Sequence, residues 1–132
     1  MADTNRGNRP LSPHLTIYKP QITSILSILN RITGIAMAFP VILIVIWFLS
    51  AAIGPSFFGS VDWFITSWFG LLILVASLWA FWFHFLNGLR HLAWDMIWGL
   101  DMSDVNKTGW LVFYLSIIAT VLCVAFAAWA GS

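Results

Sequence analysis

The sequence predicts an all-α integral membrane protein with three transmembrane helices. Hydrophobic residues make up 61% of the 132-residue chain and charged residues only 8%, whereas a soluble domain carries about 25% charged residues. No Asp, Glu, Lys or Arg occurs between Arg31 and Asp62, between Asp62 and Arg90, or after Lys107. Each of these intervals exceeds the roughly 20 apolar residues that cross the hydrocarbon core as a helix.

The first part of the chain divides into a polar segment and a long apolar helix. Residues 1–20 contain three prolines, which prevent a long helix there, and we expect them to lie on the inner face of the membrane. Residues 21–131 are predicted to form the membrane-anchor domain. Its first span is expected at about 32–53, with a kink at Pro40 that neighbouring groups in a membrane can accommodate.

Two further spans follow, separated by segments rich in turn-forming residues. The sequence GPSFFGS predicts a turn after the first span because it contains glycine and proline. The second span is expected at about 64–89, and its helix can continue as far as Trp98. The sequence GLDMSDVNKTG predicts the next loop, and the third span is expected at about 110–130.

The distribution of basic residues predicts the orientation of the chain. The first loop holds only Asp62 and the C-terminal end has no charged side chain, whereas the other two polar regions hold all the basic residues: Arg6, Arg9, Lys19, Arg31, Arg90 and Lys107. By the positive-inside rule the N-terminus lies inside and the C-terminus outside. The N-terminal sequence lacks the character of a transit peptide, which favours a bacterial inner membrane; in a eukaryote it would be the mitochondrial inner membrane.

The second span carries one stripe of polar and small residues. At about 100° per residue, Gly88, His91 and Asp95 all project within about 40° of His84, whereas Arg90 falls off this face, near the membrane boundary. Ionisable residues inside a membrane are costly and normally face protein or a cofactor. The stripe is therefore a candidate binding face.

His84 has two interpretations on these observations alone. It is either a buried histidine that hydrogen-bonds a neighbouring helix, or an axial ligand of haem iron, for which neutral imidazole is a common ligand. Gly88, one turn away, either leaves room for a flat macrocycle or allows close helix packing. His91 and Asp95 lie nearer the inner surface, where a solvated helix end is the simpler interpretation.

A second polar set lies at the start of the first helix. Ser27, Arg31 and Gly34 share a face, with Asn30 beside it. Arg31 either extends to lipid phosphates or, together with Ser27, binds haem propionates or a quinone oxygen. Both polar sets lie at the inner ends of their helices and could form one site.

The number of histidines limits how a haem could be held. The chain has three, and His14 precedes the membrane segments. Two histidines on different membrane helices of this chain are therefore not available to ligate one haem. If His84 is an axial ligand, the second ligand should come from another chain.

Two stretches resemble a known family. The sequences RPLSPHLTIYKPQITSILSILNRITG, from Arg9 to Gly34, and HFLNGLRHLAWD, from His84 to Asp95, are similar to the cytochrome b556 membrane-anchor subunits of succinate dehydrogenase, respiratory complex II. The resemblance extends over the whole chain, including three spans and an inner N-terminus. Each motif alone is a weak signal, but the pair at this separation is specific.

The resemblance implies roles for individual residues. His84 matches the axial ligand of haem b, the second ligand being supplied by the partner small anchor subunit. Ser27 and Arg31 match positions that line the ubiquinone pocket, and Arg31 also lies near the haem propionates. His91 and Asp95 match the end of the second motif, near the haem and the quinone site. Where the family often has His, this chain has Asn30, which can donate a hydrogen bond to a propionate but carries no positive charge.

The implied function is that of a haem-bearing anchor in a succinate:ubiquinone oxidoreductase. The implied partners are a second small anchor subunit, the iron–sulfur subunit, the flavoprotein that oxidises succinate, and membrane lipid, with no nucleic acid. This chain would help form the ubiquinone site but carry no succinate-oxidising residue. The alternatives are a haem-free anchor in which His84 only packs, and a helix-packing subunit of another membrane complex.

Overall fold

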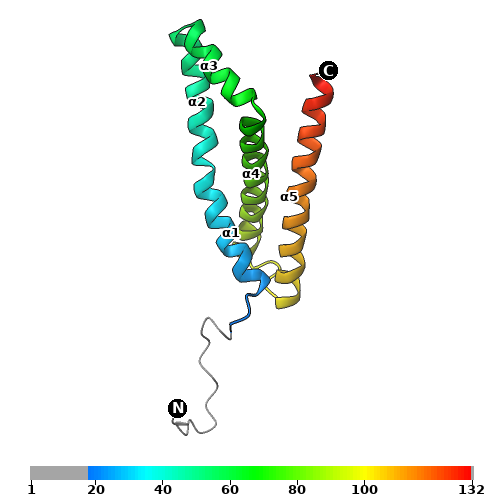
Figure 1. Ribbon diagram of the computed structural model, residues 1–132. Helices are drawn as coiled ribbons and strands as arrows, with labels where there is room; N and C mark the ends of the chain where they lie inside the picture. The colour runs from blue at the N-terminus through cyan, green and yellow to red at the C-terminus, as the bar shows by residue number, and fades with distance from the viewer. Residues whose placement is uncertain (1–17, 132) are drawn as a thin grey trace, which may run out of the picture.

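The computed structural model describes residues 18–131, and this range is helical with no strand. The polar segment predicted for residues 1–20 lies almost entirely outside the described residues. Figure 1 shows the five helices: α1 (Ile22–Ala36), α2 (Ala38–Ile53), α3 (Pro55–Thr66), α4 (Trp68–Asp95) and α5 (Met102–Ala130).

Three of the helical runs are long and apolar enough to cross a membrane. They are Ile22–Ile53 with 32 residues, Trp68–Asp95 with 28 and Met102–Ala130 with 29. At 1.5 Å per residue each exceeds the hydrocarbon thickness of about 30 Å. The prediction of an all-α chain with three membrane-spanning helices is therefore confirmed.

The first run is interrupted where its proline predicts. Met37 forms a turn between α1 and α2, three residues before Pro40. Proline has no backbone N–H, so it cannot donate to the carbonyl of Ala36, and its ring crowds that carbonyl. The result is two helices that follow one another instead of one regular helix.

The turn predicted at GPSFFGS is confined to Gly54, and the rest of the segment is helical. Only Gly54, with φ of 152°, separates α2 from α3. Pro55 begins α3, because the first turn of a helix needs no N–H at that position and favours the φ angle that proline fixes. A proline taken as a helix breaker is here the first residue of a helix.

The boundaries of the last two helices also differ from those expected. Ser67 caps the start of α4 by accepting a 3.1 Å hydrogen bond from the N–H of Gly70. The helix ends at Asp95 instead of continuing to Trp98, and Ile97 and Gly99 have φ of 63° and 69°. The segment after Asp101, expected to be a loop, forms the first turns of α5.

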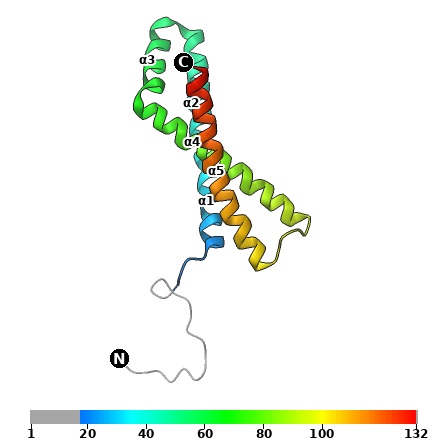
Figure 2. The same cartoon turned by 90° about the vertical axis from the view of Figure 1, so that its right-hand side faces the viewer.

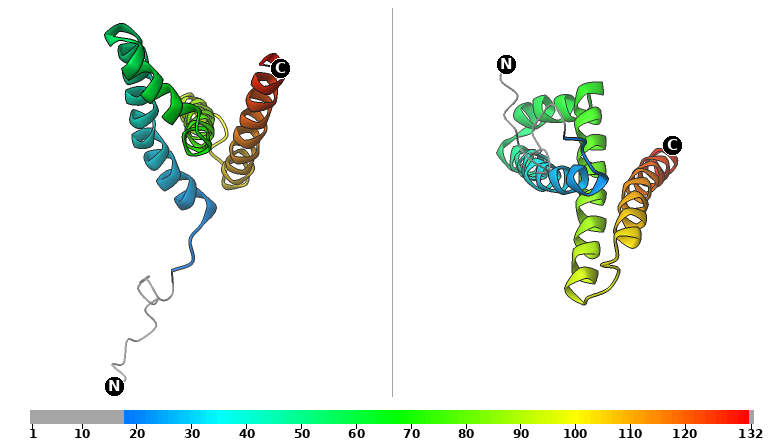
Figure 3. Two further views of the ribbon diagram at one scale, coloured as in Figure 1. Left: turned by 45° about the horizontal axis from the view of Figure 1, so that its top comes forward. Right: turned by 90° about the horizontal axis from the view of Figure 1, so that it is seen from below.

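The helices converge at one end of the molecule. The α4–α5 connection and the start of α1 lie at this end, and the α2–α3 turn and the C-terminus lie at the other (Figure 1). Viewed along the bundle, α4 lies between α1 on one side and α5 on the other (Figure 3). The two views in Figures 1 and 2 show α3 folding back from α2 toward the start of α4.

The buried core is small and lies where α1, α4 and α5 meet. Leu26, Phe83 and Val112 form its centre, one from each helix, with partly buried apolar neighbours around them. Most other large apolar side chains on all five helices are exposed. Such a surface is unsuited to water, and lipid or other membrane subunits must cover it.

Basic residues are distributed unequally between the two ends. Arg31 lies on α1, Arg90 near the end of α4 and Lys107 near the start of α5, so these elements bring the basic residues to the converging end. Asp62 lies on α3 at the other end and accepts a 3.2 Å hydrogen bond from Nε1 of Trp47. The side of the membrane that the basic end faces stays a prediction.

Candidate functional site

His84 lies between α4 and α1. Its side chain is half-buried, and Nδ1 lies 3.0 Å from the backbone carbonyl oxygen of Asn30. A carbonyl can only accept a hydrogen bond, so Nδ1 is the donor in this contact, and in a neutral imidazole Nε2 then carries the lone pair. Nε2 makes no hydrogen bond to any residue between 18 and 131, and this nitrogen is therefore free to ligate a metal.

Gly34 makes room for the imidazole of His84. A Cβ atom at Gly34 would lie 2.8 Å from Cε1 and 3.2 Å from Nδ1 of that ring, closer than van der Waals contact allows. Sequence reasoning placed Gly34 on the polar face of the first helix but did not connect it to His84. Spacing within one helix does not reveal a contact between two helices.

Gly88 presents an open position. A Cβ atom added there would meet nothing within 4 Å in the described part of the chain. The close helix contact considered for this glycine is therefore not made between the described helices. The space one turn from His84 is open to a cofactor or to another subunit.

A cavity of about 210 Å³ lies at the converging end, formed by three helices. Residues from α1, α4 and α5 line it: Thr23, Ser27, Asn87, Arg90, His91, Trp94 and Val105. Ser27 thus lines the same cavity as His91. Arg31, one turn after Ser27, is exposed and lines no part of it.

Arg90 is a central residue of this cavity, contrary to the expectation that it stands apart at the membrane boundary. It is 8% exposed. Its Nε donates to Oγ1 of Thr108 at 3.0 Å and its Nη2 to the carbonyl of Val105 at 2.7 Å. The guanidinium also lies 4.1 Å from the ring centroid of Trp94, a favourable cation–π contact. Arg90 faces α5. The angle measured from His84 on the helix did not predict this, because such an angle carries no information about where α5 packs.

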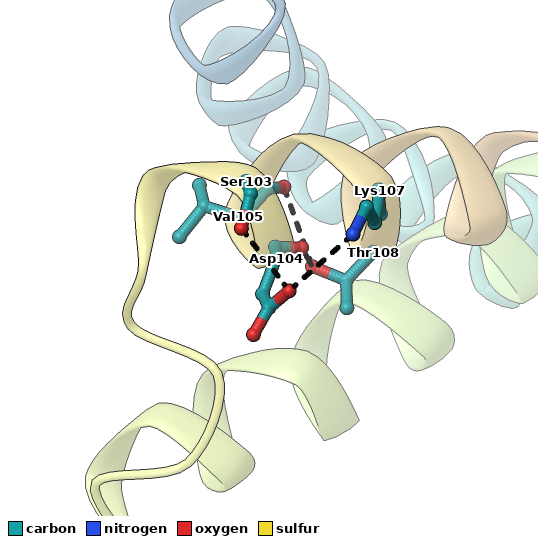
Figure 4. Close-up of polar contacts among 5 residues, drawn as sticks. All are labelled: Ser103, Asp104, Val105, Lys107 and Thr108. Atoms are coloured by element: carbon teal, nitrogen blue, oxygen red, sulfur yellow. Dashed lines mark hydrogen bonds and ion pairs between the residues drawn. The ribbon is translucent and has the colours of Figure 1, made fainter.

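The first turns of α5 hold the acceptors of Arg90 in place. Thr108 Oγ1 donates to the carbonyl of Asp104 at 2.7 Å, leaving its lone pairs for Arg90. Figure 4 shows this contact beside the ion pair of Asp104 and Lys107, whose closest atoms are 3.9 Å apart. The segment expected to be a loop therefore supplies two ordered acceptors for the guanidinium.

Asn87 contacts two other residues of α4, Arg90 and His91. The residue is 1% exposed, and its Oδ1 accepts a 3.3 Å hydrogen bond from Nη1 of Arg90. Its backbone carbonyl accepts a 2.7 Å hydrogen bond from Nδ1 of His91. Its Nδ2 is buried and has no partner among the described residues. A buried donor without an acceptor is costly and marks a place where a ligand can bind.

The remaining predicted site residues lie apart from one another. His91 is exposed and its ring centroid lies 5.0 Å from that of Trp94 in an edge-to-face arrangement. Asp95 is the exposed last residue of α4. The side chain of Asn30 has a buried Oδ1 without a partner in the described range. The stripe predicted from His84 to Asp95 therefore faces α1 at His84 and the cavity at His91.

The sequence did contain a signal for the two residues that were missed. Asn87 and Arg90 are three residues apart, one turn of a helix, and Arg90 is the only basic residue within the described α4. A basic residue in a span needs a polar neighbour. No group of three potential metal-ligating side chains occurs among residues 18–131, so His84 would ligate a metal as a single residue of this chain.

Comparison with known proteins agrees with the resemblance of the two motifs. Residues 5–123 match the family described as succinate dehydrogenase/fumarate reductase transmembrane subunits. The chain is 44% identical over 122 residues to the succinate dehydrogenase cytochrome b556 subunit of Paracoccus denitrificans, covering 92% of this chain and 94% of that protein.

Two other relatives are similar over most of their length. The cytochrome b556 subunit of Rickettsia conorii is 44% identical over 116 residues, covering 88% of this chain and 90% of the relative. The cytochrome b560 subunit of Marchantia polymorpha is 34% identical over 129 residues, covering 94% of each chain. The chain belongs to the family of succinate dehydrogenase/fumarate reductase transmembrane subunits.

Proposed function

We propose that this chain is the haem b-carrying membrane anchor of a succinate:ubiquinone oxidoreductase. The single observation that carries the haem assignment is the 3.0 Å contact from Nδ1 of His84 to the carbonyl oxygen of Asn30. This contact fixes the tautomer and the ring, as the second hydrogen bond of a metal-ligating histidine does. The relatives that are named cytochrome b556 and b560 subunits support it.

The residues around His84 fit a haem group. Nε2 of His84 is the free nitrogen, and Gly88 leaves open space one turn away on the same helix. Phe81 and Phe85, stacked with centroids 6.0 Å apart, add an exposed apolar surface to α4. Bound to His84, haem b would supply one-electron transfer by its iron. The protein's part is to position the imidazole of His84, for which Gly34 leaves room and to which the carbonyl of Asn30 is hydrogen-bonded.

The second axial ligand is proposed to come from the partner small anchor subunit. Within residues 18–131 the one other histidine is His91, which lies on the same helix as His84. Its Nδ1 donates to the carbonyl of Asn87. Two ligands on one helix, seven residues apart, cannot approach opposite faces of one iron.

The anchoring role is proposed from the two kinds of surface on the chain. The exposed apolar side chains of α2 and α5 suit lipid and the second anchor subunit. The basic end suits attachment of the iron–sulfur subunit and, beyond it, the flavoprotein. By the positive-inside rule this end faces the bacterial cytoplasm, or the matrix if the membrane is mitochondrial.

The quinone site is proposed at the same end. The hydroxyl of Ser27 would donate a hydrogen bond to a carbonyl oxygen of ubiquinone, and the positive charge of Arg31 would stabilise negative charge that develops during reduction. Asn30, His91 and Asp95 lie at this end of the helices and are proposed to line the haem-propionate and quinone region. The electrons would come from succinate through the iron–sulfur subunit.

Purification of the tagged chain in mild detergent tests the proposal. We expect a flavoprotein, an iron–sulfur protein and a second small membrane protein to co-elute, and succinate or dithionite to produce a low-spin b-type spectrum. A complex that contains these subunits but no haem would favour the haem-free anchor. Co-elution with unrelated membrane proteins alone would contradict the assignment to this oxidoreductase.

A further inference from the structure

The cavity that Ser27 lines has a donor set that the family resemblance does not assign. Ser27 lines it from α1, whereas Asn87, Arg90 and Trp94 line it from α4. Arg31 does not line the cavity. If Ser27 binds a ligand here, the charged group that shares the cavity with it is Arg90.

Arg90 has unused hydrogen-bond donors and no counterion among the described residues. A guanidinium has five N–H donors, and the contacts to Thr108, Val105 and Asn87 use three of them. No carboxylate among residues 18–131 lies within 4.0 Å of it; the one ion pair in this range joins Lys107 and Asp104. A buried positive charge without a counterion creates a positive potential, which attracts an electron-rich ligand.

The orientation of the Asn87 amide follows from Arg90. Because Nη1 of Arg90 can only donate, the atom of Asn87 that lies 3.3 Å away must be the oxygen. The NH₂ group is then directed away from Arg90 and has no partner among the described residues. A buried amide held in this way offers a hydrogen bond to an acceptor without losing side-chain freedom on binding.

Trp94 and the size of the cavity restrict the shape of the ligand. Its indole lies under the guanidinium of Arg90 and contacts the ring of His91. A cavity of about 210 Å³ with an aromatic wall suits one planar ring better than a macrocycle. An acceptor oxygen on one small flat ring fits both the unpartnered donor and the cavity.

We propose that Asn87 donates a hydrogen bond to a carbonyl oxygen of a quinone headgroup in this cavity, with Arg90 as its positioning residue and local positive charge. The proposal rests on the proposed function and deepens it, since it assigns to Ser27 a pair of partners on α4. It is a binding contact, in which no bond is made or broken. Arg31 then acts from outside the cavity.

The variant Asn87→Asp removes the donor together with the uncompensated charge while keeping the contact with Arg90. Its carboxylate keeps the shape of the amide and still accepts from Arg90, so the contact between α4 and α5 is retained. It replaces the NH₂ donor by an acceptor and neutralises the local charge. In the purified complex we expect KM for a short-chain ubiquinone analogue to rise about tenfold, equivalent to one lost hydrogen bond, with succinate oxidation by a soluble dye and haem content unchanged.

Asn106→Asp is the matched control, because it makes the same change at an exposed position of α5, and it should leave KM unchanged. An unchanged KM in Asn87→Asp would overturn the inference, and so would equal loss of quinone and dye reduction, which indicates a role in assembly. If KM is unchanged in Asn87→Asp but raised in Ser27→Ala, the proposed quinone site stands without Asn87. If Ser27→Ala and Arg31→Ala also leave KM unchanged, the proposed quinone site is wrong.

Discussion

The imidazole of His84 occupies the space into which a side chain on Gly34 would extend. A Cβ atom at Gly34 would come within 2.8 Å of Cε1 of His84. The same ring is also held by the carbonyl of Asn30, four residues earlier on α1. Two residues of α1 therefore set the position of His84 together. Gly34 does so by lacking a side chain, and Asn30 by its backbone carbonyl.

Gly34→Ala is expected to displace the His84 ring. The new methyl group would overlap Cε1, and the ring or the two helices must move, at a cost of about 1–3 kcal/mol. We expect a lower ratio of haem to protein and a lower thermal midpoint of the purified complex. Both are measurable by a pyridine haemochrome assay and by thermal unfolding.

Gly59→Ala is the control for this substitution. Gly59 lies in the exposed helix α3, and a Cβ atom there would meet nothing within 4 Å of the described residues. Alanine in place of glycine within a helix should be neutral or stabilise by up to about 1 kcal/mol. Equal haem content in Gly34→Ala and Gly59→Ala would contradict the positioning role of Gly34.

His84→Ala should abolish the b-type spectrum, whereas His91→Ala should retain it. The free Nε2 of His84 is the proposed ligand, while the His91 ring is exposed and bonded to its own helix. Reduced-minus-oxidised spectra of the two purified complexes make the comparison. An unchanged spectrum and haem content in His84→Ala would show that this histidine only packs, as in a haem-free anchor.

Arg31→Ala is expected to impair quinone reduction without destabilising the chain. Arg31 is exposed and makes no hydrogen bond or ion pair to a residue between 18 and 131, so its removal should leave the fold intact. Loss of the positive charge that would stabilise the reduced quinone should lower kcat/KM for quinone by about tenfold, while succinate oxidation by a soluble dye persists.

Lys19→Ala, which removes another exposed basic side chain near the same helix, is the control and should leave both activities unchanged. If Arg31→Ala loses both activities to the same extent, the arginine serves assembly of the complex instead of the quinone site.

The helical class and the three long helices could be predicted from the sequence because charge-free intervals longer than a bilayer leave few alternatives. The ends of the helices could not, since Pro40 accompanies an interruption of the first helical run at Met37, whereas Pro55 begins a helix. The same residue type has opposite effects in a helix interior and in a first turn. Which of the two applies depends on where the preceding helix stops, and here Gly54 ends α2.

The candidate site was predictable within one helix and not between helices. The family motifs made Ser27 and His84 candidates and the angular stripe added His91 and Asp95, since these follow from order along the chain. The contacts of Gly34 with His84 and of Arg90 with Val105 join different helices. They depend on the packing of α4 against its neighbours, which a single sequence does not specify.

Thr108→Val tests the attachment of α5 to α4. Valine has the shape of threonine but removes the Oγ1 that accepts from Nε of Arg90 at 3.0 Å, leaving a donor of a buried cation without a partner. We expect the free energy of unfolding to fall by about 0.5–2 kcal/mol. Hydrogen bonds between membrane helices contribute about 0.6 kcal/mol on average, and those to charged groups contribute more. Thr66→Val is the matched control, because Thr66 also donates to its own helix, at 2.7 Å to the carbonyl of Asp62, but contacts no arginine. Thermal unfolding of both variants in the same detergent gives the difference, and equal midpoints would show that the Arg90 contact contributes nothing to the packing of α4 and α5.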